Sequence, residues 1–491
     1  MSMSSQKLQN FKVIISEDTL KKAEEYKQEL LQGKKAGDLF GEKLAAKTLQ
    51  TISTEAFISA LIKTKSPMIF AESSINGDGK DWNQKELSIL GDINITVPVT
   101  IFDNGAHYDP TPHAQPFSGT LLFTPGALLR NDQGGTTPDM TEVVKNNQIN
   151  REAFYNLYER RILPLLVSAN ISAGEKGKQA LVTIPGIGCG MFAGKFRGQL
   201  GRELQNVLEK IIQKHGKDLK NIKAVYYDPY DECENERKKI EEIDLMVRPL
   251  LKTPDGKPKR SQLCPPEQYQ EDGDNFSNCE LFSLVAWDQA SWPGNDYYEG
   301  SRATDDGVKA AATSSMQSMT GVQGEYDKES GMYLPPGDYV NWNAVIDSLK
   351  IELNTEGKIF VAVNGNLQRL HNNRLIPLVS SSLSQSSLIA TLSSASSSPA
   401  SARIKDHIVT PDMAGALYIA VTDMGKGKEL LGLTNEHEPE KFSKALDILG
   451  ITPENVNFNG RDGYVVSLNN EQFQKIEKIC NPHGKASSLH M

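Results

Sequence analysis

The sequence lacks the apolar segments that direct a protein into a membrane. No apolar run reaches the roughly 18 residues of a membrane-spanning helix, and residues 1–7 lead to no apolar core of a signal peptide. Ser2 excludes N-myristoylation, and the last residues form no prenylation motif. We therefore expect a protein without a membrane partner.

Cysteine and excess basic charge are also scarce. The five cysteines among 491 residues are scattered and form no Cys-x-x-Cys pair, so we expect a reducing compartment and no zinc ribbon. The 53 Lys and Arg residues are outnumbered by 62 Asp and Glu residues, which gives a net charge of -9. Because proteins bind nucleic acid through a basic surface, this balance argues against nucleic acid as a partner.

A glycine-rich loop is the most informative motif that the sequence does contain. Apolar residues 180–184 predict a buried strand, and residues 198–213 predict a helix with one apolar face. The loop between them contains Gly186, Gly188, Gly190 and Gly194. Glycines let the backbone approach an anion, and the N-terminus of the following helix adds a partial positive charge. The arrangement therefore predicts a ligand that carries phosphate.

Two common phosphate-binding motifs fit this loop poorly. A nucleoside-triphosphate loop ends in Gly-Lys-Ser/Thr, whereas Phe196 follows Lys195 here, and Gly190 lies one residue too close to the Gly-Lys pair. A dinucleotide loop requires an acidic residue at the end of the next strand, about 20 residues later. Glu209 lies inside the expected helix, and the next strand ends later, at Asp228. A structural strand-to-helix turn without a ligand stays open as an alternative.

The order of the hydrophobic patterns predicts an α/β fold. Strands are expected at residues 68–71, 93–102, 120–124, 180–184, 224–227 and 281–287. Helices are expected at residues 151–167, 198–213, 235–250 and 304–319, with Pro164 kinking or ending the first of them. Because helices separate several of the strands, we expect a three-layer α/β/α sandwich with a mixed, partly parallel sheet.

Composition divides the chain into four expected segments. An N-terminal helical extension covers residues 1–59, with Ser16 as the N-cap of its first helix. The catalytic domain is expected at residues 60–350. A connecting segment at 351–402 contains a Ser-rich linker. A small C-terminal α/β domain is expected at 403–491, with strands at 416–421 and 463–468 and helices at 439–449 and from residue 470.

A second strand-loop-helix unit concentrates carboxylates. Asp288 follows the expected strand, Asp296 lies in the loop, and Asp305 and Asp306 begin the next helix. If the sheet is parallel here, these residues lie at the same edge as the glycine loop, where open α/β sheets bind ligands. Each acid alone is compatible with turn closure or with the helix dipole. Together they repel one another unless they face a cation, either Mg²⁺ or a guanidinium.

Both motifs resemble those of one protein family. Residues 186–192 are similar to the diphosphate loop of macrodomains, and the spacing of Asp288, Asp296 and Asp306 is similar to that of the three essential aspartates of MavL-type macrodomains. These bacterial effectors remove ADP-ribose from arginine, including that of ADP-ribosylated ubiquitin. The resemblance implies an ADP-ribosyl-arginine hydrolase that cleaves an N-glycosidic bond with these three catalytic aspartates and without a metal or other cofactor.

The resemblance also implies ligand contacts, a partner and a location. The partner is expected to be an ADP-ribosylated protein, with ubiquitin among the candidates, and the enzyme a monomeric effector secreted into the host cytosol. Contacts to ADP-ribose are expected from Gly186, Ile187, Gly188, Cys189, Gly190, Met191, Phe192, Asp103, Asn104 and Asp228.

The roles of the acids follow from their expected positions. Asp306, beside a helix N-terminus, is expected to stay ionised and to accept a ribose hydroxyl or activate water. Asp288 and Asp296 are expected to bind the guanidinium and to assist its departure. The lone Glu299 does not complete the Gln-Glu-Glu signature of poly-ADP-ribose glycohydrolases. Two rival functions stay open, namely a reader that binds ADP-ribosylated proteins without cleavage and a Mg-dependent hydrolase of a nucleotide-diphosphate compound.

Overall fold

The computed structural model divides the chain into two units, Gln6–Ser382 and a second unit made of Leu383–Met491 with Met1–Ser5. It describes residues 9–45, 49–252, 260–337 and 339–377, together with five short strands between residues 403 and 467.

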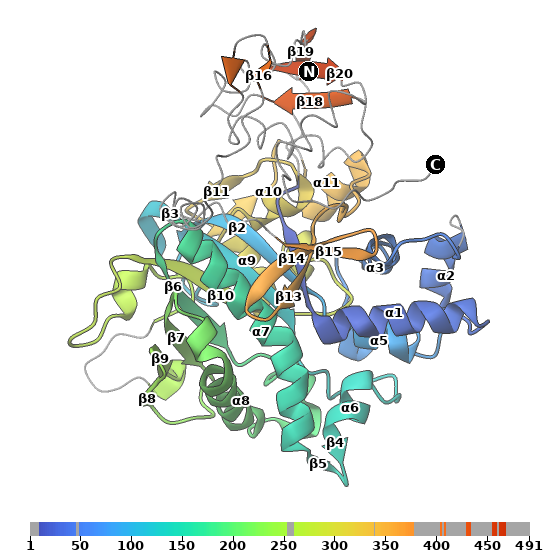
Figure 1. Ribbon diagram of the computed structural model, residues 1–491. Coiled ribbons are helices and arrows are strands. Elements are labelled where there is room, and N and C mark those ends of the chain that lie inside the picture. The colour runs from blue at the N-terminus through green and yellow to red at the C-terminus, as the bar shows by residue number, and fades with distance from the viewer. Residues whose placement is uncertain are drawn as a thin grey trace, which may run out of the picture. The chain divides into compact units, whose positions relative to one another are not determined.

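An eleven-stranded mixed sheet forms the centre of the larger unit (Figure 1). Five neighbouring strands in it are parallel, so their carboxyl ends share one edge of the sheet; these are β3, β10, β6, β7 and β9. In spatial order the strands are β15 (Arg374–Pro377), β14 (Asn366–His371), β13 (Ile359–Val363), β1 (Lys12–Ser16), β2 (Asn94–Asp103), β3 (Pro112–Pro125), β10 (Cys279–Trp287), β6 (Gln179–Pro185), β7 (Ile222–Asp228), β9 (Ile243–Val247) and β8 (Glu236–Ile240).

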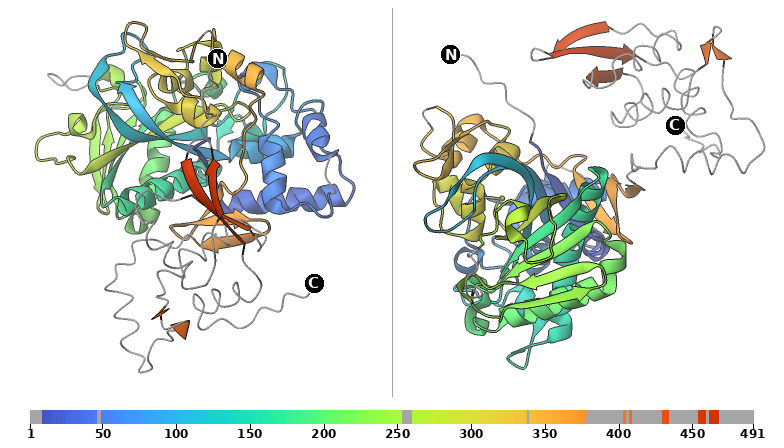
Figure 2. Two further views of the ribbon diagram at one scale, coloured as in Figure 1. Left: turned by 90° about the horizontal axis from the view of Figure 1, so that it is seen from above. Right: turned by 90° about the vertical axis from the view of Figure 1, so that its left-hand side faces the viewer.

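Helices cover both faces of this sheet (Figures 1 and 2). One core cluster contains the apolar side chains of α7 (Arg151–Glu175) and α8 (Leu200–His215). The other contains apolar residues of α1 (Glu17–Leu31), α2 (Asp38–Ala45), α3 (Thr54–Ile62), α4 (Ala71–Ser74), α5 (Gln84–Gly91), α9 (Asp305–Ala311), α10 (Ser315–Thr320) and α11 (Trp342–Leu349). Successive strand residues alternate between the clusters, as Leu122 and Phe123 do. The predicted α/β/α sandwich with a mixed sheet is therefore confirmed.

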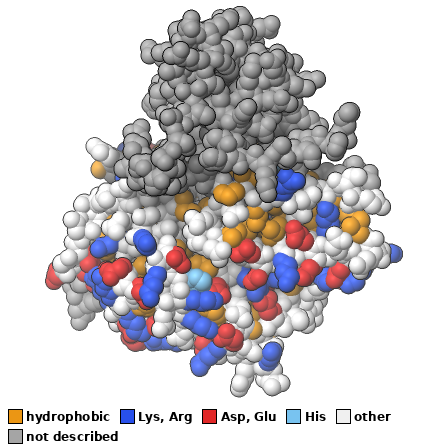
Figure 3. Space-filling view, viewed as in Figure 1, with side chains coloured by type: hydrophobic (Ala, Val, Ile, Leu, Met, Phe, Trp, Pro, Cys, Tyr) orange, Lys and Arg blue, Asp and Glu red, His pale blue; other side chains and the backbone are white. Residues whose placement is uncertain are grey.

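The outer surface of the helices is polar. Figure 3 shows Lys, Arg, Asp and Glu side chains interspersed over the face seen in Figure 1. This is the pattern expected of helices that bury one side against a sheet and expose the other to water. Among the described helices, none combines the length and the apolar character needed to cross a membrane.

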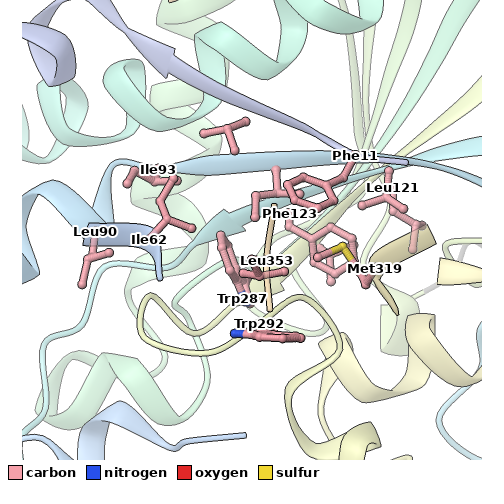
Figure 4. Packing of buried hydrophobic residues seen from close by; sticks show 14 of the residues in the cluster. Phe11, Ile62, Leu90, Ile93, Leu121, Phe123, Trp287, Trp292, Met319 and Leu353 are labelled. Atoms are coloured by element: carbon pink, nitrogen blue, oxygen red, sulfur yellow. The ribbon is translucent and has the colours of Figure 1, made fainter. Parts of the chain in front are cut away.

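Aromatic packing fixes the end of β10, from which the acidic segment leaves the sheet. The rings of Phe123 and Trp287 lie 6.3 Å apart in an edge-on arrangement, and Trp287 is buried (Figure 4). Trp292, five residues further on, is also buried in the same cluster. Because large buried side chains hold both ends of this stretch, the intervening residues, which begin with Asp288, are held against the core.

Two predicted elements are wrong. Residues 68–71 form no strand and lead into the short helix α4. Residues 235–250 form the antiparallel hairpin of β8 and β9 instead of a helix. The charged residues there suit a helix locally, but β9 pairs in parallel with β7 and buries Leu245 and Val247. Tertiary pairing therefore overrides the local preference.

Proline does not end α7. The helix continues beyond Pro164 to Glu175, because the residues after the proline are buried, among them Leu165 and Ala173. Burial of this long face offsets the backbone hydrogen bond that proline cannot make. The helix predicted at residues 304–319 is interrupted and forms α9 and α10.

The sheet includes strands from both ends of the larger unit. β1 precedes α1 and pairs with β2 in an antiparallel and with β13 in a parallel arrangement. β14 and β15 extend the same side of the sheet. The N-cap prediction is confirmed, because the Ser16 side chain accepts a hydrogen bond from the backbone amide of Thr19 at 3.0 Å.

Short elements connect these layers. They are α6 (Pro138–Val143), β4 (Val144–Lys145), β5 (Gln148–Ile149), β11 (Glu325–Asp327), β12 (Met332–Leu334) and the 3₁₀ turns η1 (Met191–Phe196), η2 (Gly216–Asp218), η3 (Leu250–Lys252), η4 (Pro266–Tyr269) and η5 (Asn295–Glu299).

The second unit contains a three-stranded antiparallel sheet in the order β18 (Glu429–Leu433), β20 (Arg461–Ser467) and β19 (Glu454–Phe458). A further hairpin pairs β16 (Arg403–Ile404) with β17 (His407–Ile408). The strand predicted at 463–468 overlaps β20. The strand predicted at 416–421, the helices predicted at 439–449 and from residue 470, and the Ser-rich linker lie outside the described residues.

Candidate functional site

Three loops meet at the carboxyl edge of the parallel strands. They follow β3, β6 and β10 and comprise residues 126–130, 186–194 and 288–300. β10 pairs in parallel with β3 on one side and with β6 on the other. The glycine loop and the acidic segment therefore leave the same edge of the sheet from adjacent strands, as expected.

The glycine loop packs closely against the loop that follows β3. Gly188 has a φ of 74°, and a Cβ added there would lie 2.6 Å from the Tyr158 hydroxyl and 2.8 Å from the Ala127 amide nitrogen. That hydroxyl donates to the carbonyl of Ile187 at 2.7 Å and accepts from the amide of Ala127 at 3.1 Å. The positive φ and the close packing thus explain glycine at position 188 even without a bound ligand.

Backbone amides of the loop point to an anion-binding role. Within the described part of the chain, the amides of Gly188 and Gly190 donate no hydrogen bond, and Gly190 is exposed. The loop continues into η1, so α8 begins only at Leu200. The N-terminus of α8 is therefore separated from the start of the glycine loop by η1.

The other residues of the loop differ in exposure. Ile187 is buried, Phe192 is half-buried and Met191 is 57% exposed. Cys189 is buried, its thiol lies 3.7 Å from the carbonyl oxygen of Ile187, and burial raises its pKa well above the ordinary value. The thiolate is therefore disfavoured, and Cys189 fits a small loop residue better than a nucleophile.

Arg130 adds a cation beside the glycine loop, and sequence patterns did not point to it. Its Nη1 lies 3.9 Å from the sulfur of Met191, and a Cβ on Gly194 would lie 3.3 Å from its own Cβ. The guanidinium makes two hydrogen bonds to the carboxylate of Asp132, at 2.7 and 2.6 Å. Arg130 belongs to the loop after β3, 61 residues before Met191, so only the fold brings the two together.

Asp288 begins the acidic segment and is held by two backbone amides. Its Oδ2 accepts from Ala71 at 2.6 Å and its Oδ1 from Ala290 at 2.9 Å. The residue is 5% exposed, and burial raises its pKa to about 7. Lys65 lies nearby, with its Nζ 4.1 Å from the centre of the Trp287 ring, and burial lowers its pKa to about 7. The Asp288 carboxyl is therefore able to exchange a proton near neutral pH.

Asp296 holds the beginning of α9. Its Oδ2 accepts from the backbone amides of Ala303 and Thr304, both at 3.1 Å, and its Oδ1 accepts from the Thr304 hydroxyl at 2.5 Å. The carboxylate also leaves no space for a Cβ on Gly307. These contacts favour a positioning role for Asp296 over direct binding of a guanidinium.

Asp306 presents a buried oxygen without a partner. Its Oδ1 accepts from the amide of Gly294 at 2.7 Å, whereas its Oδ2 has no hydrogen-bond partner among the described residues. Burial, followed by the charge of Asp296, raises the pKa of Asp306 well above the ordinary value. This direction is opposite to the expectation that Asp306 stays ionised, because the cost of desolvation outweighs the helix dipole.

Glu72 is a fourth carboxylate at this place, and the sequence patterns missed it. The residue is 9% exposed, and its Oε2 has no hydrogen-bond partner among the described residues. The amide of Ala71, the residue before Glu72, donates to Asp288, so the two acids are neighbours, and burial, with the charge of Glu72 adding to it, raises the pKa of Asp288. The strand wrongly predicted at residues 68–71 gave no reason to connect Glu72 with the acidic segment, which lies more than 200 residues later.

Asp305, the remaining acid of the segment, links α9 to β10. Its Oδ2 accepts from the backbone amide of Ala286 at 2.8 Å and from the Lys309 ammonium at 3.1 Å. Lys309 is buried and also donates to the carbonyl of Leu284 at 2.5 Å. Asp305 is therefore occupied by structural contacts.

The two predicted contacts at the end of β2, Asp103 and Asn104, are engaged within the protein. Asp103 forms a two-point ion pair with Arg302, at 2.9 and 3.0 Å, and accepts from the Tyr326 hydroxyl at 2.8 Å. Asn104 accepts through its side chain from the amides of Ala106 and Thr111. Asp103 thus anchors the end of the acidic loop, and contact of either residue with ADP-ribose stays a prediction.

Asn104 and Asp228 are brought to the same neighbourhood by one segment. Leu263 donates through its amide to the carbonyl of Asn104 at 3.2 Å, and the adjacent Gln262 donates to Asp228 at 3.4 Å. Asp228 ends β7 and also accepts from the amides of Tyr230 and Leu250. Burial raises the pKa of Asp228. Residues 262–263 therefore contact both Asn104 and Asp228.

Among the described residues, no group of three or more His, Cys, Asp and Glu side chains is placed to hold a metal ion. The carboxylates of the acidic segment are instead bound largely by backbone amides, which fix their orientation.

A glycine loop and an acidic segment on adjacent parallel strands of an α/β/α sandwich define a macrodomain-type protein. Residues 11–339 match the family described as macrodomain effector MavL. The chain belongs to this family, which confirms the resemblance seen in the two motifs and makes the chain an ADP-ribose-binding macrodomain effector. A comparison with curated proteins gives no match.

Proposed function

We propose that this chain removes ADP-ribose from an arginine side chain of a modified protein, with ubiquitin among the candidate substrates. The observation that carries the proposal is the buried Asp306 carboxyl, whose Oδ2 lacks a partner among the described residues. A buried carboxyl group is costly unless it is paired, and a guanidinium pairs with it by charge-assisted hydrogen bonds. The modified arginine supplies such a group.

The two loops divide the substrate between them. The amides of Gly188 and Gly190, which donate to no group of the described residues, and the neighbouring guanidinium of Arg130 suit the diphosphate of ADP-ribose. The distal ribose and the arginine then extend toward the segment after β10, which leaves the sheet beside the glycine loop. The anionic and cationic parts of the substrate thus meet groups of opposite charge.

The chemistry is the hydrolysis of an N-glycosidic bond. The bond between C1″ of the ribose and the guanidinium nitrogen breaks, and the oxygen of water bonds to C1″. The transition state carries positive charge on the ribose, which an ionised carboxylate stabilises. The guanidine departs as a neutral group, while a carboxylate takes a proton from water and passes it on to regenerate the guanidinium.

The environment of the acids suits these steps. The pKa of Asp288, about 7, allows this carboxyl to accept and release a proton near neutral pH. Asp306 is predicted to ionise when the substrate binds, because a neighbouring cation lowers the pKa of a carboxyl group. Asp296 contributes by holding Thr304 and the start of α9, which carries Asp306.

We further propose that the enzyme works as a monomer in the host cytosol and uses neither a metal nor a cofactor. Incubation of the protein with arginine-, serine- and glutamate-linked ADP-ribosylated proteins tests the proposal through the ADP-ribose released. We expect release from the arginine linkage alone, and the same rate with EDTA. Binding of ADP-ribose without any release would identify a reader, and loss of activity with EDTA would identify a Mg-dependent hydrolase.

A further inference from the structure

We propose that Glu72 is a further substrate-contacting residue, which together with Asp306 holds the guanidinium of the modified arginine and sets the preference for arginine-linked ADP-ribose. This inference rests on the proposed function, since it concerns the substrate of the same site.

The position of Glu72 is fixed from two sides. On one side, the amide of Ala71 donates to Asp288 at 2.6 Å, and the amide of Ile69 donates to the side chain of Asn295 at 2.9 Å. On the other side, the carbonyl of Glu72 accepts from the amide of Asp132 at 2.7 Å. The short helix α4 is thus held between the acidic segment and the loop that carries Arg130.

The second side also connects Glu72 to the expected diphosphate site. Asp132, which binds the backbone of Glu72, holds the guanidinium of Arg130 through its carboxylate. The hydrogen bond to Asp132 is the main cause of the raised pKa of Arg130, and the charge of the neighbouring Glu72 adds to it. Glu72 therefore lies between the group expected to hold the phosphates and the aspartates expected to act on the arginine.

Glu72 and Asp306 are tied to the same stretch of the acidic segment, since Asp306 accepts from the amide of Gly294 and the adjacent Asn295 accepts from the amide of Ile69, three residues before Glu72. Both oxygens of Asp288 and both oxygens of Asp296 already accept hydrogen bonds. Glu72 Oε2 and Asp306 Oδ2 are buried and have no partner among the described residues. Two such acceptors match the guanidinium of the modified arginine, which is planar and keeps all but one of the five N–H donors of arginine.

A purely structural role for Glu72 explains this arrangement less well. A buried polar atom without a partner destabilises the folded state, and native proteins contain few of them. Glutamine would fill the same volume without adding a second negative charge beside Asp288. A carboxylate at position 72 is therefore better explained by a cation that binds there.

The test compares Glu72→Gln with the matched control Glu280→Gln. Glu280 is also a buried glutamate with an Oε2 that lacks a partner, but it lies near the start of β10, where it pairs with Lys176. We expect Glu72→Gln to lower kcat/KM on an arginine-linked substrate by about tenfold to a hundredfold, mainly through KM, since a charge-assisted contact to the bound arginine is lost. The Kd for free ADP-ribose should change less than about twofold, and the control should keep wild-type kinetics.

Several outcomes would overturn the inference without touching the proposed function. In the first, the wild type is active and Glu72→Gln has the same kcat/KM. In the second, the Glu280→Gln control loses as much kcat/KM as Glu72→Gln does. In the third, Glu72→Gln loses as much affinity for free ADP-ribose as it loses in kcat/KM. If Glu72→Gln melts at a much lower temperature than the wild type, Glu72→Asp replaces it and should retain part of the activity.

An inactive wild type would contradict the proposed function but still leave Glu72 testable. The Kd for an ADP-ribosyl-arginine peptide would then be compared with the Kd for free ADP-ribose. The inference expects the wild type to prefer the peptide and Glu72→Gln to lose that preference. Equal preferences in the two proteins would overturn it.

Discussion

The Asp288 carboxylate accepts a hydrogen bond from the backbone amide of Ala71, which lies 217 positions earlier in the chain, at 2.6 Å. This contact joins the loop after β10 to the start of α4. It also places Glu72, the residue after Ala71, beside Asp288. The acidic site is thus assembled from two segments that are distant in sequence, and its chemistry depends on how tightly they are held together.

The first prediction concerns the pH dependence of stability. Burial raises the pKa of Asp288 from 3.8 in the unfolded chain to about 7 in the folded protein. The folded state therefore binds more protons between these values, and the contribution of Asp288 to stability is full below about pH 4 and falls as the pH rises toward 7. Between pH 5 and pH 7 this loss amounts to about 2 kcal/mol, at roughly 1.4 kcal/mol per pKa unit.

Asp288→Asn should remove this pH dependence. Urea denaturation at pH 5 and at pH 7 measures the free energy of unfolding of both proteins. We expect the advantage of the wild type over the variant to shrink between pH 5 and pH 7. An advantage that stays constant or grows would show that Asp288 has an ordinary pKa.

The second prediction concerns the positioning role of Asp296. Asp296→Asn keeps the shape of the side chain but replaces one of its two acceptor oxygens by an NH₂ group, whereas one oxygen now accepts from two amides and the other from a hydroxyl. We expect a destabilisation of about 1–3 kcal/mol and a loss of turnover, because the start of α9 shifts. Binding of free ADP-ribose should persist, and calorimetry together with a thermal melt measures both effects. Full activity at wild-type stability would exclude any role for Asp296.

The third prediction separates the two causes of glycine at position 188. Gly188→Ala should destabilise the protein by about 1–3 kcal/mol, because φ is positive and the new Cβ meets the Tyr158 hydroxyl. Tyr158→Phe removes two hydrogen bonds of the hydroxyl, and it should destabilise the Gly188→Ala variant less than the wild type, since in the variant it also relieves the clash. Thermal melts of the single and double variants provide the measurement. If Tyr158→Phe costs as much stability in the Gly188→Ala variant as in the wild type, the contact with Tyr158 is not the constraint.

The fourth prediction concerns the cation beside the glycine loop. Arg130→Gln should raise the Kd for ADP-ribose by about tenfold, because a charge-assisted hydrogen bond to a phosphate contributes about 1.5–3 kcal/mol. The loss should shrink at high salt, which screens the attraction of the wild-type residue for the ligand. Asp132→Asn serves as the control, since it frees the Arg130 guanidinium and should not weaken binding. Titration calorimetry at two salt concentrations measures the Kd of each protein for ADP-ribose. If both variants bind ADP-ribose as tightly as the wild type, the role of Arg130 is contradicted.

Much of the fold could be predicted from local patterns. The two motifs follow β6 and β10. Both strands are visible in the sequence as apolar runs, because a strand shielded from solvent consists of apolar residues. The N-cap of α1 is visible in the sequence because capping is a local interaction. The hairpin of β8 and β9 and the pairing of β1 with β13 were not predictable in the same way, since they depend on strands far away in the chain.

The site shows the same limit. Asp288, Asp296 and Asp306 were found because they follow one another along a single loop and helix. Glu72 and Arg130 were missed because each belongs to another loop, and only tertiary contacts bring it to the site. The charge state of Asp306 was misjudged because the helix N-terminus is visible in the sequence, whereas the extent of burial is not.

The central claim is that the glycine loop binds ADP-ribose while the acidic segment cleaves it from arginine. The most direct measurement compares wild type and Asp306→Asn for two quantities, the rate of ADP-ribose release from an arginine-ADP-ribosylated protein and the Kd for free ADP-ribose. The account predicts that the variant loses at least about a hundredfold in rate, while its Kd for ADP-ribose stays close to that of the wild type. Release by Asp306→Asn at the wild-type rate, or binding by the wild type without any release, would contradict it.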